Sequence, residues 1–238
     1  LENFARAQQF DYLRIARDKT RNTTLAFVEL GDGGERKFSF FRKNTADSAL
    51  PAVSDEIARI ADVALIGSLP LTEESGRKFA DGLIQKMHGA KKTVAFDGNY
   101  RDDLFADRAA AIKIYARYIA EDELDLFAEG ANTEEKLYAV AGKDKIALVT
   151  KGAEGSMACV NGAFFQADSI PVSPVDTTGA GDAFFAGVLS AISDGEKNWN
   201  TILRKGNVCG ALATERRGAI DSFPTKNRVW QVMRNGLR

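Results

Sequence analysis

Residues 175–184 read Val-Asp-Thr-Thr-Gly-Ala-Gly-Asp-Ala-Phe and form the most informative stretch of the chain. Glycines directly before an apolar helical pattern let the backbone turn so that several N–H groups point at one place. The N-terminus of the following helix adds partial positive charge at the same place. The stretch therefore predicts a cradle for an anion such as a phosphate, followed by a helix over residues 180–192.

Asp182 falls in the first turn of that helix, beside the predicted cradle. A carboxylate there would repel a bound phosphate, but it fits a site where it takes a proton from a hydroxyl that attacks a phosphoryl group. The alternative is that Asp182 only complements the helix dipole and that Gly179 and Gly181 only form a turn. Residue types alone leave both interpretations open.

Outside this stretch, short apolar runs alternate with helical patterns. The runs are β-rich and end at a polar residue or a glycine, which is typical of strands buried on both faces of a parallel sheet. The helical patterns begin at capping residues, most clearly at Thr72-Glu73-Glu74-Ser75. Such alternation predicts an α/β fold, with strands at 62–67, 93–97 and 145–150 and helices at 54–60, 72–88 and 132–141.

Two predicted β-hairpins interrupt the alternation. The first joins strands at 23–30 and 36–42 through a glycine-rich turn that fits neither common phosphate-loop pattern. The second joins 156–160 to 163–166 through Asn161-Gly162, the preferred sequence of a type I′ turn.

A last helix is predicted over residues 199–217, and it contains two glycines. Gly206 and Gly210 each weaken a helix by about 1 kcal/mol relative to alanine. They therefore indicate that another backbone or a ligand approaches this helix closely.

The composition excludes several classes of protein. The 238 residues carry 32 basic and 33 acidic side chains, so the basic excess typical of nucleic-acid binders is absent. No apolar run approaches the roughly 20 residues of a membrane span. A single histidine and two cysteines without Cys-x-x-Cys spacing exclude a Cys/His zinc site. We expect no nucleic-acid or membrane partner, and we expect Cys159 and Cys209 to be buried free thiols in a reducing compartment.

The motif at 176–184 resembles the C-terminal signature of the ribokinase-like (phosphofructokinase B) carbohydrate kinases. Other segments resemble the family in the same order, so the resemblance covers essentially the whole chain. Residues 97–101 resemble the family's Asp-Pro-Asn-x-Arg motif, with Gly98 in place of proline. The segments at 23–28, 34–36 and 38–42 resemble its lid and substrate-side strands, 149–155 its nucleotide-side turn, and 206–214, 218–220 and 224–225 the fructokinases in particular.

The resemblance implies one kinase domain over residues 1–238, with a three-layer α/β/α sandwich, a mainly parallel central sheet and a small β lid at 23–42. It implies ATP-dependent phosphorylation of a sugar hydroxyl, with fructose as the first choice of substrate. The alternative within the class is a kinase for another sugar, such as 2-dehydro-3-deoxygluconate or ribose. The alternative outside it is a catalytically silent kinase-like protein that serves binding or assembly. By the same analogy we expect a cytoplasmic homodimer.

The resemblance also assigns roles by position. Asp182 would be the general base, and the backbone N–H groups of Gly179, Ala180 and Gly181 would form the anion hole for the transferring phosphoryl group. ATP would lie beside Thr150, Lys151, Gly152 and Gly155, with Asn207 near its adenine. Arg42 and Asn99 are candidates for the sugar side, although Arg42 could instead be a solvated strand end. Glu123 would help to organise a largely water-held Mg²⁺, while Asp176 and Thr178 match the family's monovalent-cation position, here K⁺.

The sequence departs from the family pattern in two places. The family's Asn/Ser-x-x-Glu motif aligns with residues 120–123, where Glu123 is kept but Ala120 cannot form a side-chain hydrogen bond. Nothing before Thr23 matches the family's N-terminal sugar-gripping Asp or its Gly-Gly…Asn motif. We therefore expect that the N-terminal part of the kinase is missing and that 238 residues are a lower bound on its length.

Overall fold

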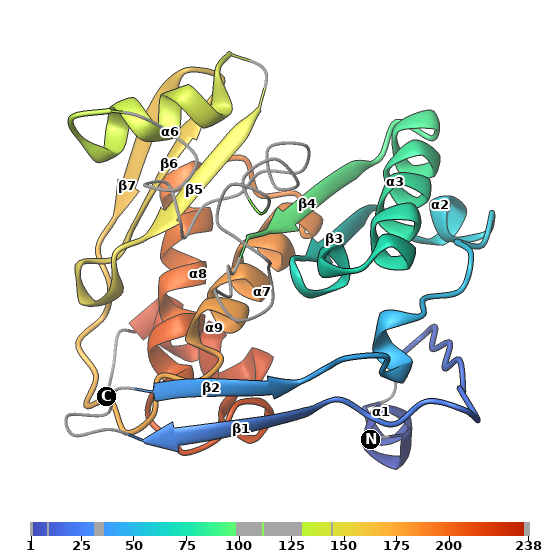
Figure 1. Ribbon diagram of the computed structural model, residues 1–238. Helices are drawn as coiled ribbons and strands as arrows, with labels where there is room; N and C mark the ends of the chain where they lie inside the picture. The colour runs from blue at the N-terminus through green and yellow to red at the C-terminus, as the bar shows by residue number, and fades with distance from the viewer. Residues whose placement is uncertain are drawn as a thin grey trace.

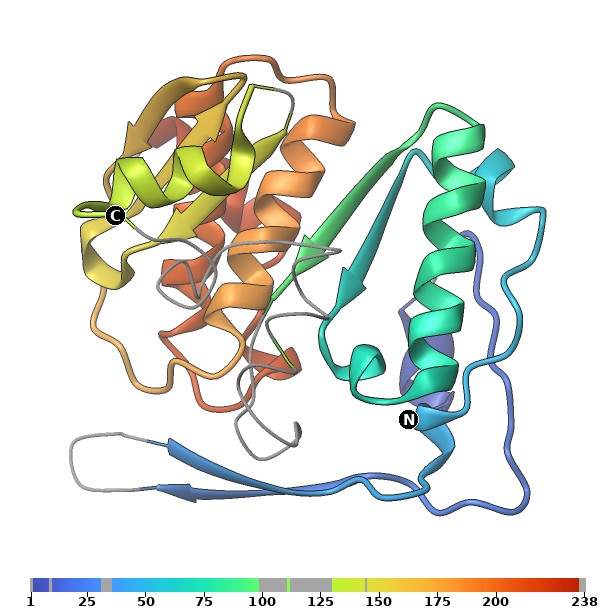
Figure 2. The ribbon, with the colours of Figure 1, turned by 45° about the horizontal axis from the view of Figure 1, so that its top comes forward.

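The computed structural model describes residues 2–8, 10–30, 36–98, 111, 130–143 and 145–235. Figure 1 shows a long β-hairpin beneath two α/β groups, one built on β3 and β4 and the other on β5, β6 and β7. The two groups are seen apart in Figure 2, with the hairpin running below both of them. Each group has its own hydrophobic core, and the helices α7, α8 and α9 belong to the second.

The first group is a parallel strand pair covered by one long helix. β3 (Val63–Gly67) pairs in parallel with β4 (Thr93–Asp97), and α3 (Glu74–Gly89) forms the connection between them. The helix buries Ala80, Leu83 and Met87 against Ile66 and Phe96 of the strands. Both predicted strands, their parallel pairing and this helix are confirmed.

The predicted start of α3 is wrong. Its N-cap residue is Glu73, which makes no side-chain capping bond. Thr72 does not cap the helix, because it ends the short 3-10 helix η3 (Leu69–Thr72), where its hydroxyl donates to Leu69 O at 2.9 Å. The helix predicted at 54–60 is also shorter than expected, since α2 covers only Ile57–Ile60.

The second group contains an antiparallel meander of β5 (Ile146–Thr150), β6 (Ser156–Val160) and β7 (Ala163–Ala167). The parallel arrangement expected for the run at 145–150 is therefore replaced by antiparallel pairing of β5 with β6. The predicted hairpin around Asn161 and Gly162 is confirmed, with φ of 51° and 81°, the positive values that a type I′ turn requires.

Helices cover both faces of this meander (Figure 2). α6 (Thr133–Ala141) packs on one face and is capped as predicted, because Asn132 Oδ1 accepts from the Glu135 N–H at 2.9 Å. α7 (Ala180–Ser193) and α8 (Trp199–Ala213) pack on the other face, and α9 (Lys226–Asn235) packs against α8. α8 ends four residues before the predicted position of 217.

Gly206 and Gly210 of α8 have the close neighbour that the sequence predicted, namely helix α7. A Cβ atom at Gly206 would lie 2.7 Å from the Phe184 ring and 2.9 Å from Val188. On the facing side, a Cβ atom at Gly187 would lie 3.0 Å from the Cα of Gly206. The two helices therefore touch along their backbones. Gly210 faces the start of α7, since a Cβ atom there would lie 3.1 Å from Ala180 O.

The hairpin below the two groups consists of β1 (Leu25–Leu30) and β2 (Arg36–Phe41), paired antiparallel with Leu25 opposite Phe41. This confirms the strands predicted for the lid. Its side chains include large exposed apolar groups, with Phe27 and Phe41 57% and 64% exposed. The remaining short elements are α1 (Glu2–Ala7), η2 (Ala46–Ser48), η5 (Gly152–Glu154) and η6 (Ile220–Ser222).

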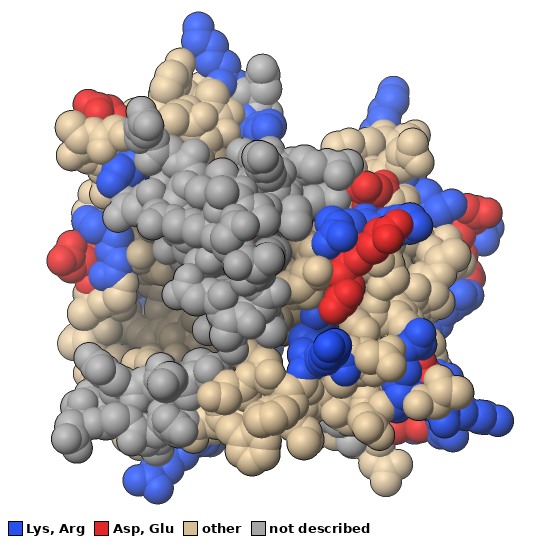
Figure 3. Space-filling view, viewed as in Figure 1, with Lys and Arg blue, Asp and Glu red and all other residues tan. Residues whose placement is uncertain are grey.

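The surface mixes both signs of charge. Basic and acidic side chains lie next to one another over the β3–α3 group in Figure 3. Among the ion pairs of this group are Lys86 with Asp55 and Lys92 with Asp62. Within the described ranges, no helix is both long and apolar enough to cross a lipid bilayer. Cys159 and Cys209 are buried free thiols, as expected.

Candidate active site

The predicted anion cradle lies at the start of α7. Gly179 is its N-cap residue and has a φ of 80°, a left-handed conformation that favours glycine. A Cβ atom there would also lie 2.8 Å from the ring of Phe223, so the turn and the segment around η6 are packed against each other. The first α-helical bond runs from the Ala183 N–H to Gly179 O at 2.9 Å, so Gly181 and Asp182 stand in the first turn of the helix.

Ala180 is one of the three residues predicted to form the anion hole. Its N–H donates to Thr177 O at 3.2 Å and thereby closes the turn. An anion hole formed by Gly179, Ala180 and Gly181 stays a prediction. Asp182 itself is exposed in the first helical turn, next to these groups.

Asp176 holds the loop before the cradle in place. Its Oδ1 accepts from the Thr178 N–H at 2.9 Å and from the Thr178 hydroxyl at 2.6 Å, while its Oδ2 accepts from the Gly218 N–H at 3.0 Å. The N–H groups of Val175 and Asp176 both donate to Thr214 O, at 2.7 and 3.1 Å. The loop is thus tied to the segment that follows α8.

The predicted nucleotide-side residues lie at the turn between β5 and β6. Thr150 ends β5, and the Lys151 N–H donates to Gly155 O at 2.7 Å across the η5 turn. Gly155 has a φ of 98°, and a Cβ atom there would lie only 2.1 Å from Ala167 O. Gly152 also has a positive φ of 56°. The conformation of this turn therefore requires glycine at two of the four predicted positions.

Asn207, which was expected near the adenine, is buried in α8 and has a structural partner. Its Nδ2 donates to Ala167 O at 2.8 Å and to Asp168 O at 3.2 Å. Ala167 O is also the atom that excludes a side chain at Gly155. Asn207 therefore connects α8 to the end of β7 and, through it, to the nucleotide-side turn.

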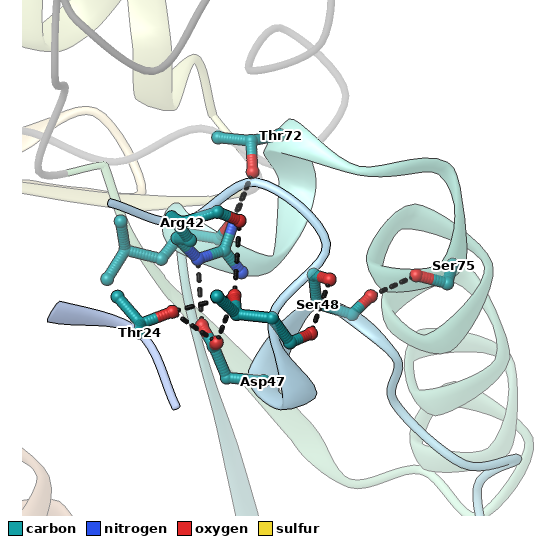
Figure 4. A network of polar contacts seen from close by, with 8 residues as sticks. Thr24, Arg42, Asp47, Ser48, Thr72 and Ser75 are labelled. Carbon is teal, nitrogen blue, oxygen red and sulfur yellow. Dashed lines mark hydrogen bonds and ion pairs between the residues drawn. The ribbon is translucent and has the colours of Figure 1, made fainter. Parts of the chain in front are cut away.

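Arg42 is not a solvated strand end, so that alternative is wrong. It follows β2 directly and is only 6% exposed. Its Nε donates to Asp47 Oδ2 at 2.8 Å, and its Nη1 donates to the hydroxyl of Thr72 (Figure 4). The sequence analysis missed both partners, Asp47 and Thr72. The polar stretch at residues 42–48, directly after the second lid strand, is a signal that could have suggested polar contacts at the base of the lid.

The network around Arg42 joins three parts of the chain (Figure 4). The hydroxyls of Thr24 and Thr45 lie within hydrogen-bonding distance of each other and of Asp47 Oδ1. Burial of Asp47 alone would raise its pKa, but the hydrogen bonds from Thr24, Thr45 and Arg42 outweigh it and hold the pKa of this carboxyl below its usual value. Asp47 is therefore ionised at neutral pH and paired with the guanidinium.

Two predicted site residues, Asn99 and Glu123, lie outside the described residues. Within the described part of the chain, no group of three or more His, Cys, Asp or Glu side chains could hold a metal ion.

Comparisons with known proteins show which family and fold the chain is similar to. The model of the pfkB family of carbohydrate kinases matches residues 2–226. The fructokinase of Escherichia coli is 31% identical over 234 residues, which cover 92% of this chain and 76% of that protein. The crystal structure of a fructokinase double mutant from Vibrio cholerae O395, in a form with bound fructose, ADP and potassium ion, matches with a TM-score of 0.81. It is 25% identical, and the match covers 98% of this chain and 79% of that chain. The fructokinase of Xylella fastidiosa with bound ATP gives a TM-score of 0.77 at 25% identity, over 92% of this chain and 75% of that one.

The fold is that of a ribokinase-like α/β kinase, and the fold class expected from the sequence is confirmed. The chain belongs to the pfkB family of carbohydrate kinases, and by that membership it is an ATP-dependent sugar kinase.

Proposed function

We propose that this protein transfers the γ-phosphoryl group of ATP to a hydroxyl of fructose. The observation that supports the proposal most strongly is the glycine turn at Gly179–Gly181 with Asp182 in the first turn of α7, within a chain of this family. The turn supplies N–H groups for the transferring phosphoryl group, and the carboxylate of Asp182 accepts the proton of the attacking hydroxyl. Each group acts where charge develops during the transfer.

The choice of fructose rests on the relatives. Fructokinases from Escherichia coli, Vibrio alginolyticus and Salmonella typhimurium match at 28–31% identity over 90% or more of this chain. The alternative substrate is another sugar, such as 2-dehydro-3-deoxygluconate or ribose. A ribokinase-like structure from E. coli does not favour ribose, because at 24% identity it supports the fold alone.

ATP and Mg²⁺ are the cofactors of this proposal. The turn formed by Thr150, Lys151, Gly152 and Gly155 would lie beside the phosphates, because its glycine conformations bring main-chain groups close to a ligand. Mg²⁺ would be held by phosphate oxygens, water and Glu123. K⁺ would bind beside Asp176 and Thr178, and a neighbour solved with potassium supports this cation.

The test is a substrate panel with ATP–Mg²⁺ and the full chain, in which ADP release is coupled to a spectrophotometric signal. We expect kcat/KM for fructose to exceed that for ribose and 2-dehydro-3-deoxygluconate by at least about tenfold. A higher value for one of the other sugars would overturn the choice of substrate. Binding of ATP–Mg²⁺ without turnover of any sugar would instead favour the silent, kinase-like binding protein.

A homodimer is part of the proposal. Leu25, Phe27 and Phe41 lie on one face of the lid, where the rings of Phe27 and Phe41 meet edge to face at 5.5 Å between centroids. A two-stranded ribbon is at best marginally stable in water, and these side chains are 55–64% exposed in a single copy. The same face of a second copy would cover them.

A further inference from the structure

The lid is attached to the body of the protein through its base, and Arg42 lies at the centre of that attachment. The incoming chain reaches the lid through Thr24, just before β1, and the outgoing chain leaves it through Arg42, just after β2. These two segments of the chain are held together at the base of the lid. There Asn22 and Thr45 form a β-bridge, and the Ala46 N–H donates to Asn22 O at 2.9 Å. Asp47 adds a contact to each of the two segments, to Thr24 before β1 and to Arg42 after β2.

The base is in turn fastened to the β3–α3 connection by two side chains (Figure 4). Arg42 Nη1 donates to Thr72 at the end of η3, and the Ser75 hydroxyl in the first turn of α3 donates to Ser48 O. This connection follows the carboxyl end of β3, and in open α/β sheets ligands bind at the carboxyl ends of the strands. The lid is therefore fastened beside the edge where a substrate is expected.

Thr72 is a firm anchor point, because η3 is held tightly against α3. Arg77 Nη1 donates to Leu71 O at 2.8 Å, and Leu71 is fully buried. A Cβ atom at Gly76 would lie 1.8 Å from Pro70 O, so the two backbones are in direct contact. A movement of the lid relative to this connection therefore has to break or stretch the Arg42 contact.

We propose that Arg42 is a positioning residue that sets the angle of the lid over the sugar site by bridging Asp47 and Thr72, and that it does not bind the sugar itself. Two donors of its guanidinium are used inside the protein, and its side chain is 4% exposed. The planar fork of arginine can hold both partners in one fixed geometry, which a lysine cannot do. The link to the sugar rests on the proposed function, whereas the link to the lid does not.

The test uses Thr72→Val, which removes the acceptor of Arg42 and keeps the shape, with Thr72→Ser as the matched control. Amide hydrogen exchange is measured over residues 25–30 and 36–41 of the full chain, together with the KM values for sugar and ATP. We expect Thr72→Val to speed exchange in the lid by at least about fivefold and to raise the KM for sugar by a similar factor. The KM for ATP is expected to stay within about twofold of wild type, and Thr72→Ser to behave as wild type.

Arg42→Lys is expected to reproduce the effect of Thr72→Val, and the double variant to add little to either, because both substitutions break the same contact. Lys92→Gln, which breaks the distant ion pair with Asp62, is expected to leave lid exchange unchanged. Wild-type exchange in the lid of Thr72→Val would overturn the proposal. The proposal would also be overturned if Arg42→Lys raised the KM for sugar strongly and Thr72→Val did not. That result would indicate that Arg42 contacts the sugar directly. If the wild type phosphorylates no sugar, the proposed function fails while the exchange measurement still decides the role of Arg42.

Discussion

Asn207 and Arg42 show at the scale of single residues that residues predicted for a ligand site also hold the fold together, while their ligand roles stay predictions. Both were expected to face a ligand, and in the structure both are buried and donate to protein oxygens. Ala167, the partner of Asn207, lies 40 positions away in the sequence, and Thr72, a partner of Arg42, lies 30 positions away. No local sequence pattern spans such separations. The turn conformations at the glycines of the site were easier to predict, because a positive φ is a local property of the backbone and glycine is the residue that most readily adopts it.

Ser156 leads to a prediction about stability. Its hydroxyl is fully buried in β6 and has no hydrogen-bond partner among the described residues. A buried unsatisfied hydroxyl costs about 1–3 kcal/mol, so we expect Ser156→Ala to leave the free energy of unfolding unchanged or to raise it by about 1 kcal/mol. Urea denaturation measures this. The control is Ser222→Ala, which should lower the free energy of unfolding because the equally buried Ser222 hydroxyl donates to Ala219 O at 2.7 Å. A clear loss of stability in Ser156→Ala would contradict the assignment.

At the scale of elements, two capping signals that look alike in sequence have opposite outcomes. Asn132 caps α6, and Glu135 Oε2 accepts in return from the Ala131 N–H at 2.7 Å. Thr72 does not cap α3, because its hydroxyl is engaged by Leu69 O and Arg42. The difference lies in tertiary competition for one hydroxyl group, which the order of residues does not reveal. Similarly, the apolar run of β5 predicts a buried strand but cannot tell whether its neighbour runs parallel or antiparallel.

The contact between α7 and α8 predicts opposite effects for two glycines in helices. Gly206→Ala would place a methyl group 2.7 Å from the Phe184 ring, so we expect it to lower the free energy of unfolding by about 1–3 kcal/mol. Gly82→Ala, in the interior of α3, meets only Val53 at 3.8 Å and should raise it by up to about 1 kcal/mol. Thermal denaturation of both variants is the measurement. If Gly206→Ala is as stable as wild type, the two helices are not in backbone contact.

At the scale of the whole molecule, the sequence predicted the α/β class, the hairpin of β1 and β2 and the glycine turn before α7. Each of these depends on a periodic pattern or a local turn. The sequence could not predict how the lid is fastened to the body, since Asp47, Thr24 and Thr72 meet Arg42 only once the chain has folded.

The exposed lid face yields a prediction about assembly. Phe41→Glu puts a charge on the apolar face, next to Phe27 and opposite Leu25, so we expect the dimer to dissociate, as measured by size-exclusion chromatography with light scattering. Val28→Glu carries the same charge on the opposite face of the ribbon and should leave the dimer intact. A wild-type protein that is monomeric at working concentration would contradict the proposed dimer.

The most direct test of the phosphoryl-transfer mechanism is the turnover of Asp182→Asn, a substitution that keeps the shape of the side chain and removes the base. ADP release with fructose and ATP–Mg²⁺ is compared with wild type and with Asp55→Asn, a control carboxylate whose side chain is 94% exposed, while thermal shift reports ATP–Mg²⁺ binding. We expect Asp182→Asn to retain ATP binding and to lose about 10²- to 10⁴-fold in kcat, with the control near wild type. Turnover of Asp182→Asn close to the wild-type rate would contradict the assignment of Asp182 as the general base.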